Sequence, residues 1–191
     1  NFCHLFADTD RSIIEEYFAG ITDKCASYIE IPFLRKDGKV RQLSLNTVRL
    51  DDSTRLCFSM DIQNRIEVEK ESQHSRDLFS SLFNSMVEGV AIHELIYDVE
   101  GKPINYRILE VNPSYEKILK MKREDVINKI GSILYKTDPA PYLEIFANVV
   151  ETGVPVVFDT YFPQLGKYFH ISVTKTINNY FFSIFSDITR S

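Results

Sequence analysis

Apolar residues in the first third of the chain recur first at helical spacing and then at strand spacing. Residues 11–21 place their apolar side chains on one face of a predicted helix, and Asp10 stands where the helix cap is expected. Alternating apolar and polar positions then predict strands over residues 28–34, 39–47 and 55–61. The predicted order is one helix followed by three strands.

Two short polar segments separate these strands and are predicted to form hairpin turns. Lys36-Asp37-Gly38-Lys39 joins the first two strands, because an Asp-Gly pair favours a tight turn. Asp51-Asp52-Ser53 joins the second strand to the third. The three strands are therefore expected to pair in an antiparallel sheet.

The next segment lacks the apolar periodicity of a core element. Residues 64–76 are rich in charged helix formers and contain neither Gly nor Pro, which predicts a helical linker. The linker continues into an apolar stripe at helical spacing, formed by Leu78, Phe79, Leu82, Phe83 and Met86.

The second half of the chain carries a longer series of elements. Asn112-Pro113 opens a helix, because Asn caps free amides and Pro fits the first helical position. A longer helix is predicted from Pro141 to a closing Gly153. The other predicted elements are a short helix around 124–129 and strands over about 89–97, 105–111, 154–162, 167–177 and 179–187. This order predicts an α+β fold, an antiparallel sheet with helices on one side.

The start of the chain is repeated later at a nearly constant offset. Pairs of identical residues 128 positions apart include Asp10 and Asp138, Gly38 and Gly166, and Lys39 and Lys167. After a gap of two residues, Asp61-Ile62 matches Asp187-Ile188. Because the matches fall at helix starts, turns and strand ends, residues 1–63 are predicted to be the C-terminal half of a module. A helical linker over 64–79 then leads to the complete copy over 80–190.

Several ordered stretches of the complete copy resemble the PAS sensory domain family. They are Glu88-Gly89-Val90-Ala91-Ile92, Leu109-Glu110-Val111-Asn112-Pro113-Ser114-Tyr115-Glu116, Lys122-Arg123-Glu124-Asp125-Val126-Ile127-Asn128-Lys129 and Asp187-Ile188-Thr189-Arg190. The resemblance implies a five-stranded sheet wrapped by helices around a small pocket. It also implies a sensory role inside a larger signal-transduction protein, commonly a bacterial or archaeal histidine kinase or diguanylate cyclase.

The resemblance also assigns a relay role to the strand ends. Asp187 and Thr189 would tie the last strand to the helix that follows, and Asp61 holds the same place in the first copy. Two residues depart from the family pattern. Asn128 replaces a usual Gly, and Gln63 replaces the Thr that usually closes the terminal motif.

Seven residues lie on elements that line the pocket in that family. They are Tyr106, Arg107, Tyr115, Tyr142, Phe146, Phe158 and Tyr161. Aromatic side chains with hydroxyl tips suit a small, partly polar ligand, and Arg107 would hold a carboxylate by paired hydrogen bonds. The alternative is that the aromatic residues fill the core and Arg107 reaches solvent.

The histidines do not form a cofactor site by their spacing. His93 lies on a predicted strand without a nearby partner for metal or haem, His170 is expected to face outward, and His74 lies in the linker. Neither a flavin-binding Asn-Cys-Arg-Phe stretch nor an arrangement typical of nucleophilic catalysis is present. Haem, flavin, metal and catalysis within this segment are therefore not expected, although a parent protein of this kind would be a signalling enzyme.

The composition of the chain excludes some classes of binding partner. With 22 basic and 27 acidic residues among 191, the chain lacks the clustered positive charge that nucleic acids require. It has no apolar run of about 18 residues, so no membrane span is expected. Cys3, Cys25 and Cys57 are far apart and odd in number, which favours a reduced, cytoplasmic setting.

The last strand predicts an interface, because Tyr180-Phe181-Phe182-Ser183-Ile184-Phe185 is apolar on both faces. The outer sheet face must then be covered, and we expect a homodimer through the 64–86 helix and that face. The incomplete first copy also leaves a strand edge to be covered by another segment or another chain. A second hypothesis is a module that dimerises and spaces domains without a ligand.

Overall fold

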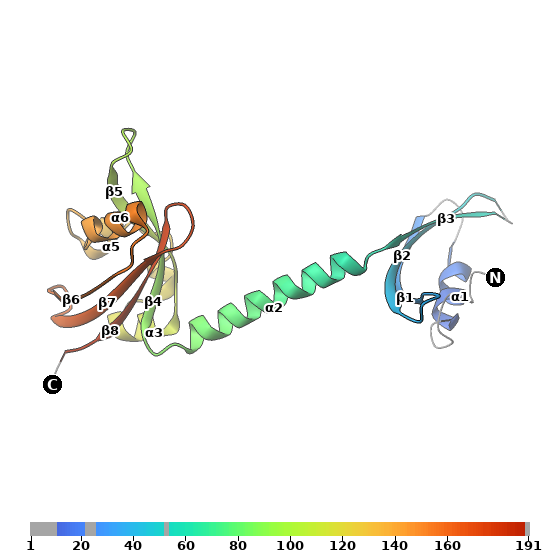
Figure 1. The fold of residues 1–191 in the computed structure, drawn as a ribbon, viewed down its shortest axis with the longest axis horizontal. Helices are drawn as coiled ribbons and strands as arrows, with labels where there is room; N and C mark the ends of the chain where they lie inside the picture. The colour runs from blue at the N-terminus through green and yellow to red at the C-terminus, as the bar shows by residue number, and fades with distance from the viewer. Residues whose placement is uncertain (1–10, 22–25, 52–53, 190–191) are drawn as a thin grey trace. The chain divides into compact units, whose positions relative to one another are not determined.

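The computed structural model describes residues 11–21, 26–51 and 54–189 (Figure 1). Two compact units are present, Asn1–Asp77 and Leu78–Ser191. Helix α2, Gln63–Ser85, begins in the first unit and ends in the second. It contains the predicted polar linker and the apolar stripe as far as Phe83.

The first unit is a helix followed by a three-stranded antiparallel sheet. Its elements are α1 (Arg11–Ala19), β1 (Ala26–Leu34), β2 (Val40–Arg49) and β3 (Arg55–Asp61), and the strand order is β1-β2-β3. The β1–β2 turn closes with a 2.9 Å hydrogen bond from Arg35 N to Lys39 O. Gly38 allows this turn, because its φ of 79° lies in the left-handed region. The predicted helix cap Asp10 and the turn residues 52–53 lie outside the described residues.

One face of this sheet is covered and the other is apolar but open. Ile14 from α1 packs with Ile31 and Leu45 in a small buried core. Strand alternation turns Leu56, Phe58 and Met60 of β3 to the opposite face. There the Phe58 and Met60 side chains are more than half exposed.

The second unit is a five-stranded antiparallel sheet covered by helices, as predicted. Its strands are β4 (Gly89–Tyr97), β5 (Pro103–Val111), β6 (Val156–Phe162), β7 (Lys167–Lys175) and β8 (Tyr180–Asp187), in the order β5-β4-β8-β7-β6. Its helices are α3 (Pro113–Leu119), α4 (Arg123–Val126), α5 (Gly131–Tyr135) and α6 (Leu143–Thr152). Helix α6 packs across β4, β5, β7 and β8, and the inward side chains of sheet and helices form a single core.

The helix ends of the second unit largely follow the sequence signals. Asn112 caps α3 by accepting a hydrogen bond from Tyr115 N at 2.9 Å, with Pro113 in the first turn, as predicted. Gly153 closes α6, also as predicted. The start of α6 differs, because Tyr142 adopts the left-handed conformation and delays the helix from Pro141 to Leu143. The five-residue α5 was not predicted.

Asn112 also joins α3 to the end of α2. Its buried side-chain amide donates to Phe83 O at 3.2 Å and to Glu88 O at 2.9 Å, and its oxygen accepts from Val90 N at 2.9 Å. The hydroxyl of Ser114 donates to Met86 O at 2.7 Å. Backbone groups at the end of α2 and the start of β4 are thus satisfied by the first turn of α3.

Within the described residues, no helix has the length and apolarity needed to cross a membrane.

Candidate functional site

A cavity of about 60 Å³ lies in the second unit between the inner sheet face and the helices. It is lined by Ala91, His93, Tyr106, Tyr115, Leu119, Tyr135, Pro141, Tyr142, Phe146, Phe162, Phe169, Ile171, Ser183 and Phe185. None of these side chains is Asp, Glu, Lys or Arg. The wall is therefore aromatic and uncharged apart from any protonated histidine.

His93 brings a buried imidazole to this wall. Its Nε2 lies 3.0 Å from the hydroxyl oxygen of Ser183, and its ring stacks on Phe181 with centroids 4.7 Å apart. Burial lowers the pKa of His93 to about 3, so the imidazole is neutral near pH 7. Its Nδ1 has no hydrogen-bond partner among the described residues. The Tyr106 ring packs edge-on against the imidazole, with ring centroids 5.3 Å apart.

Two tyrosine hydroxyls meet at the same wall. The hydroxyl oxygens of Tyr115 and Tyr135 lie 2.8 Å apart, and either can be the donor. Burial raises the pKa of Tyr135 to about 12 and raises the pKa of Tyr115 further, so both are protonated. One hydrogen bond uses only one of the two hydroxyl protons. The pair therefore retains a hydroxyl proton for another acceptor.

The structure brings four of the seven predicted pocket residues to the cavity. They are Tyr106, Tyr115, Tyr142 and Phe146. Phe158 lies behind this wall, where it packs against Tyr142 with ring centroids 5.4 Å apart. Four of the predicted side chains therefore meet at one cavity.

Arg107 and Tyr161 are corrections to the predicted pocket. Arg107 faces away from the cavity and pairs with Glu94, with Nη1 3.6 Å from Oε2. Tyr161 lies on the outer sheet face against Tyr168, with ring centroids 4.9 Å apart. Both assignments overlooked strand alternation, in which successive side chains point to opposite faces of the sheet. Arg107, for example, follows the inward Tyr106 and therefore points outward. The structure thus offers no guanidinium for a carboxylate inside the cavity.

Three polar wall residues were missed by the sequence reasoning. His93 lies between the inward residues Ala91 and Leu95, so strict alternation would have pointed it into the core. Ser183 occupies the corresponding place between two inward phenylalanines of β8. Tyr135 lies on α5, whose short apolar segment gave too weak a signal for a helix.

His74 and His170 lie away from the cavity. His170 is exposed on the outer sheet face, with Nδ1 2.5 Å from Oδ1 of Asp159, and His74 is exposed on α2. Among the residues that the structure describes, no cluster of three or more His, Cys, Asp or Glu side chains is placed to hold a metal ion.

The predicted relay residues form a compact network at the end of β8. Asp187 accepts from the ammonium of Lys167 at 2.7 Å and from Thr189 N at 3.0 Å. The hydroxyl of Thr189 accepts from Tyr168 N at 2.9 Å, while Ile188 N donates to Tyr168 O at 2.9 Å. Hydrogen bonds from Lys167 and then from Thr189 lower the pKa of Asp187 to about 2. The strand end is therefore fixed to the start of β7 by charge and by backbone pairing.

The same set of contacts occurs at the end of β3. Asp61 accepts from Gln63 N at 3.0 Å, and its Oδ2 lies 3.9 Å from Nη1 of Arg41. The side-chain oxygen of Gln63 accepts from Gln42 N at 3.1 Å, and Ile62 N donates to Gln42 O at 2.9 Å. Gln63 thus makes the backbone contact that Thr189 makes in the second unit.

These contacts correct one detail of the internal alignment. Arg41 stands opposite Asp61 as Lys167 stands opposite Asp187, so the offset of 126 already applies at the start of β2. The pairing of Leu43 with Asp61 and of Phe169 with Asp187 gives the same offset. Seven residues separate the paired Phe33 and Arg41, whereas four separate the paired Phe162 and Lys167, so the first hairpin is three residues longer. Lys39 is therefore not the counterpart of Lys167.

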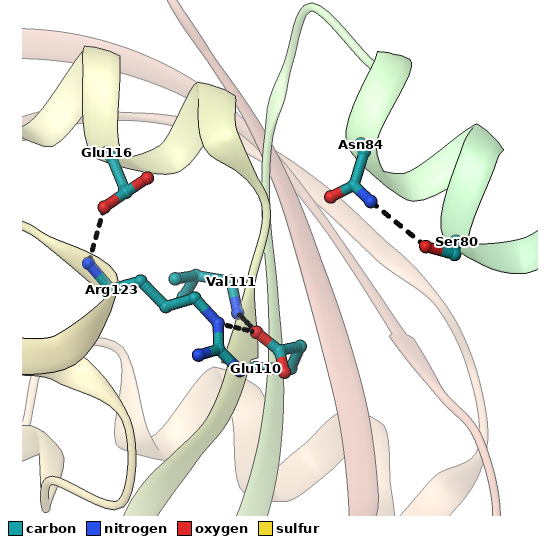
Figure 2. A network of polar contacts seen from close by, with 6 residues as sticks. All are labelled: Ser80, Asn84, Glu110, Val111, Glu116 and Arg123. Carbon is teal, nitrogen blue, oxygen red and sulfur yellow. Dashed lines mark hydrogen bonds and ion pairs between the residues drawn. The ribbon is translucent and has the colours of Figure 1, made fainter.

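A second polar network lies where α3 and α4 meet β5. Arg123 donates through Nε and Nη2 to the two carboxylate oxygens of Glu110, both at 2.6 Å, and its backbone N donates to Glu116 at 2.7 Å (Figure 2). The end of α2 adds a hydrogen bond between Asn84 and Ser80 near this network (Figure 2). The groove there measures about 300 Å³, and its carboxylates are already paired. The network fixes the α3–α4 connection to the sheet.

Comparisons with known proteins support one family. Residues 77–150 match a family model described as a PAS domain. A comparison with curated proteins found no match.

Several solved structures are similar to part of this chain. A domain of an HTR-like protein from Haloarcula marismortui is 21% identical, with a TM-score of 0.42, over 55% of this chain and 100% of that chain. A domain of a sensory box sensor histidine kinase/response regulator from Geobacter sulfurreducens is 14% identical, with a TM-score of 0.45, over 59% and 94%. The LOV protein of Rhodobacter sphaeroides is 13% identical, with a TM-score of 0.43, over 62% and 70%.

The family match covers the end of α2, the first two strands of the sheet and the helices that enclose the cavity. With the five-stranded order of the whole unit, this match shows that the C-terminal unit of the chain belongs to the PAS domain family.

Proposed function

We propose that the chain is a sensory and signal-relay module of a larger signal-transduction protein, of the histidine kinase or diguanylate cyclase type. The observation that carries the proposal is the cavity, which places neutral buried polar groups among aromatic rings. Such groups cost free energy when they lack partners, and a bound molecule supplies partners. The module would therefore bind a small molecule and report its presence.

The signal of ligand binding would be transmitted along β8. Ser183 and Phe185 line the cavity, and the same strand ends two residues later at Asp187. A ligand that displaces these side chains would act on a strand whose end is fixed to Lys167 and Thr189. The strand is thus a direct physical connection between the cavity and the proposed relay residues.

Helix α3 provides a second connection to the same place. Its Tyr115 and Leu119 line the cavity, and its Ile118 carbonyl accepts from the ammonium of Lys167 at 3.3 Å. Lys167 therefore contacts both a helix of the cavity wall and the carboxylate of Asp187. Movement of either wall would change the position of the same ammonium group.

The proposal extends to the first unit as a partial copy of the same module. Its helix and three strands follow the order of α6, β6, β7 and β8, and its Asp61–Gln63 contacts match those of Asp187–Thr189. Helix α2 begins at Gln63, directly after this network. It would receive a signal from the first sheet in the way that an output helix after Thr189 would.

In a homodimer, movements of the helices would be converted into a signal. Leu78, Phe79 and Leu82 of α2 are each more than half exposed, and the outer face of the second sheet exposes Val157, Tyr161 and Tyr168 to about the same extent. Apolar surfaces of this kind favour association. The predicted contact through the 64–86 helix and the outer sheet face remains part of this proposal.

The relay can be tested in the parent protein by comparing its output activity in Asp187→Ala and Asp125→Ala variants. Asp125 is an exposed residue of α4 and serves as a matched control. We expect only Asp187→Ala to alter the response to stimulus. An unchanged response in that variant would remove the relay from the proposal.

The alternative function is a dimerisation and spacer module without a ligand. The small size of the cavity favours it, because much of the interior is occupied by aromatic rings. Native mass spectrometry separates the two functions. A small molecule that co-purifies in stoichiometric amount supports sensing, whereas a stable empty dimer supports a spacer.

A further inference from the structure

The cavity wall carries four tyrosine hydroxyls, each of which can donate one proton. Tyr106, Tyr115, Tyr135 and Tyr142 all line the cavity, and burial holds each hydroxyl in its protonated form by raising its pKa. Tyr115 and Tyr135 share one hydrogen bond, which leaves one proton of the pair unused. The Tyr106 side chain also lines the cavity and is 2% exposed.

The charge of the wall limits what can enter. The lining contains no carboxylate, ammonium or guanidinium, and His93 is buried and neutral. A charged guest would lose its hydration without gaining an opposite charge, which is strongly unfavourable. The wall therefore selects against carboxylates, phosphates and amines.

The size of the cavity limits the guest further. One water-sized sphere needs roughly 10–15 Å³ of such space, and the cavity offers about 60 Å³. The space corresponds to roughly four to six non-hydrogen atoms. Larger aromatic cofactors would require the wall to open.

We propose that this cavity binds a small neutral molecule with an oxygen acceptor, such as a ketone, alcohol or ether. The acceptor oxygen would take the spare proton of the Tyr115–Tyr135 pair, and the apolar part of the molecule would contact the phenylalanine rings. This inference rests on the proposed sensory function and specifies the ligand class of the same site.

The test compares tetrahydrofuran with cyclopentane, which has nearly the same shape but no oxygen, and with acetate, which is charged. Each is titrated into the whole 191-residue chain, and NMR shifts are followed at Ala91 and Ile171 in the wall. We expect tetrahydrofuran to bind about five- to tenfold more tightly than cyclopentane, the gain from one hydrogen bond. Acetate is expected not to bind at the wall.

Two variants assign the preference to the hydroxyl pair. Either single substitution would leave the other hydroxyl with an unused proton. The double variant Tyr115→Phe/Tyr135→Phe is therefore expected to bring tetrahydrofuran to the affinity of cyclopentane, while Tyr161→Phe on the outer face leaves the preference intact. Equal affinities in the wild-type chain, binding of acetate, or no binding of any probe would each overturn the ligand class.

The same titration separates this inference from the sensory function. If tetrahydrofuran binds with the expected preference but the amide signals of Tyr168 and Thr189 do not move, the ligand class stands and the relay fails. If a probe without an oxygen binds equally well and moves those signals, the relay stands and the ligand class fails.

Discussion

The ammonium of Lys167 lies 2.7 Å from the carboxylate of Asp187 and also donates to the carbonyl of Ile118, which joins the end of β8 to α3. One cation thus serves two elements of the cavity wall. Because the group is partly exposed, its importance lies in position rather than in a large contribution to stability.

Replacing Lys167 with Met should release Asp187 while keeping the apolar stem of the side chain. The pKa of Asp187, lowered to about 2 mainly by Lys167, should rise toward the ordinary carboxyl value of about 3.9. The carboxyl titration followed by carbon NMR measures this change, and Lys122→Met is the exposed control. A midpoint that stays near its wild-type value would show that Thr189, not Lys167, sets this pKa.

The sign of the pH effect follows from the direction of that shift. The pKa of Asp187 is lower in the folded than in the unfolded chain, so its contribution is complete above about pH 4 and is lost as pH falls through about 2. The relay contacts should therefore persist throughout the physiological range. Loss of Thr189 amide protection between pH 7 and pH 5 would contradict this assignment.

His93 predicts a pH dependence of stability in a different range. Burial lowers its pKa to about 3 in the folded chain, whereas the unfolded chain takes up the proton near pH 6.5. The free energy of unfolding should therefore decrease as pH falls below about 6.5, by up to about 1.4 kcal/mol per pH unit, until about pH 3.

Urea unfolding at pH 7, 6 and 5 measures the His93 contribution by comparison with His93→Gln. The variant lacks the titrating imidazole, so its stability should fall less steeply over this range. Parallel pH profiles of the two proteins would mean that folding does not lower the pKa of His93.

Gly131 makes room for the Tyr106 ring. A Cβ at this position would lie 2.6 Å from two atoms of that ring, which is far inside normal contact distance. Gly131→Ala should therefore displace Tyr106 and destabilise the fold by about 1–3 kcal/mol. Urea unfolding measures the loss. Gly20→Ala, where the nearest neighbour of the added Cβ is a backbone oxygen at 3.4 Å, is the control for an added methyl group.

Asn112 should be among the most sensitive single positions of the second unit. Its fully buried amide serves Phe83, Glu88, Val90 and Tyr115, so Asn112→Ala leaves several buried backbone groups without partners. The expected loss is about 2–4 kcal/mol. The exposed Asn84→Ala provides a matched amide control.

Asn112→Asp separates the two functions of that amide. It keeps the oxygen that caps α3 but removes the donors to Phe83 O and Glu88 O. Hydrogen exchange at Val90 and Tyr115 should stay slow while the end of α2 exchanges faster. Equal acceleration at all these sites would show that the contacts are not separable.

The succession of helices and strands along the second unit was predictable because short local signals agreed with one another. Asn112-Pro113 and Gly153 marked helix ends that the structure contains, and alternation marked the strands. Asn128 stands where the family usually has Gly, and its φ of 63° lies in the left-handed region that favours glycine. Asn tolerates this left-handed conformation better than most residues, so the departure has a simple physical reason.

The cavity was harder to predict because it depends on which way each side chain points. Phe158 and Tyr161 were assigned to one wall, although an odd separation along a strand places them on opposite faces. Tyr135 was missed because a five-residue helix carries too few apolar positions for its period to appear. The His93–Ser183 contact joins strands that are far apart in the sequence, and no local pattern encodes that pairing.

Gln63 and Thr189 provide the sharpest test of the equivalence of the two strand ends. Each accepts a backbone hydrogen bond, from Gln42 N at 3.1 Å and from Tyr168 N at 2.9 Å. Gln63→Ala should speed hydrogen exchange at Gln42, and Thr189→Ala should do so at Tyr168, each by roughly fivefold for one lost hydrogen bond. Gln73→Ala on the exposed side of α2 should change neither.

Gln63→Thr decides whether the two side chains are interchangeable at this position. If the first strand end has the geometry of the second, the threonine hydroxyl should reach Gln42 N and restore the slow exchange that Gln63→Ala removes. Fast exchange at Gln42 in Gln63→Thr, together with slow exchange at Tyr168 in the same protein, would show that the first strand end needs the longer amide. The two ends would then share a sequence pattern without sharing a mechanism for holding the helix that follows.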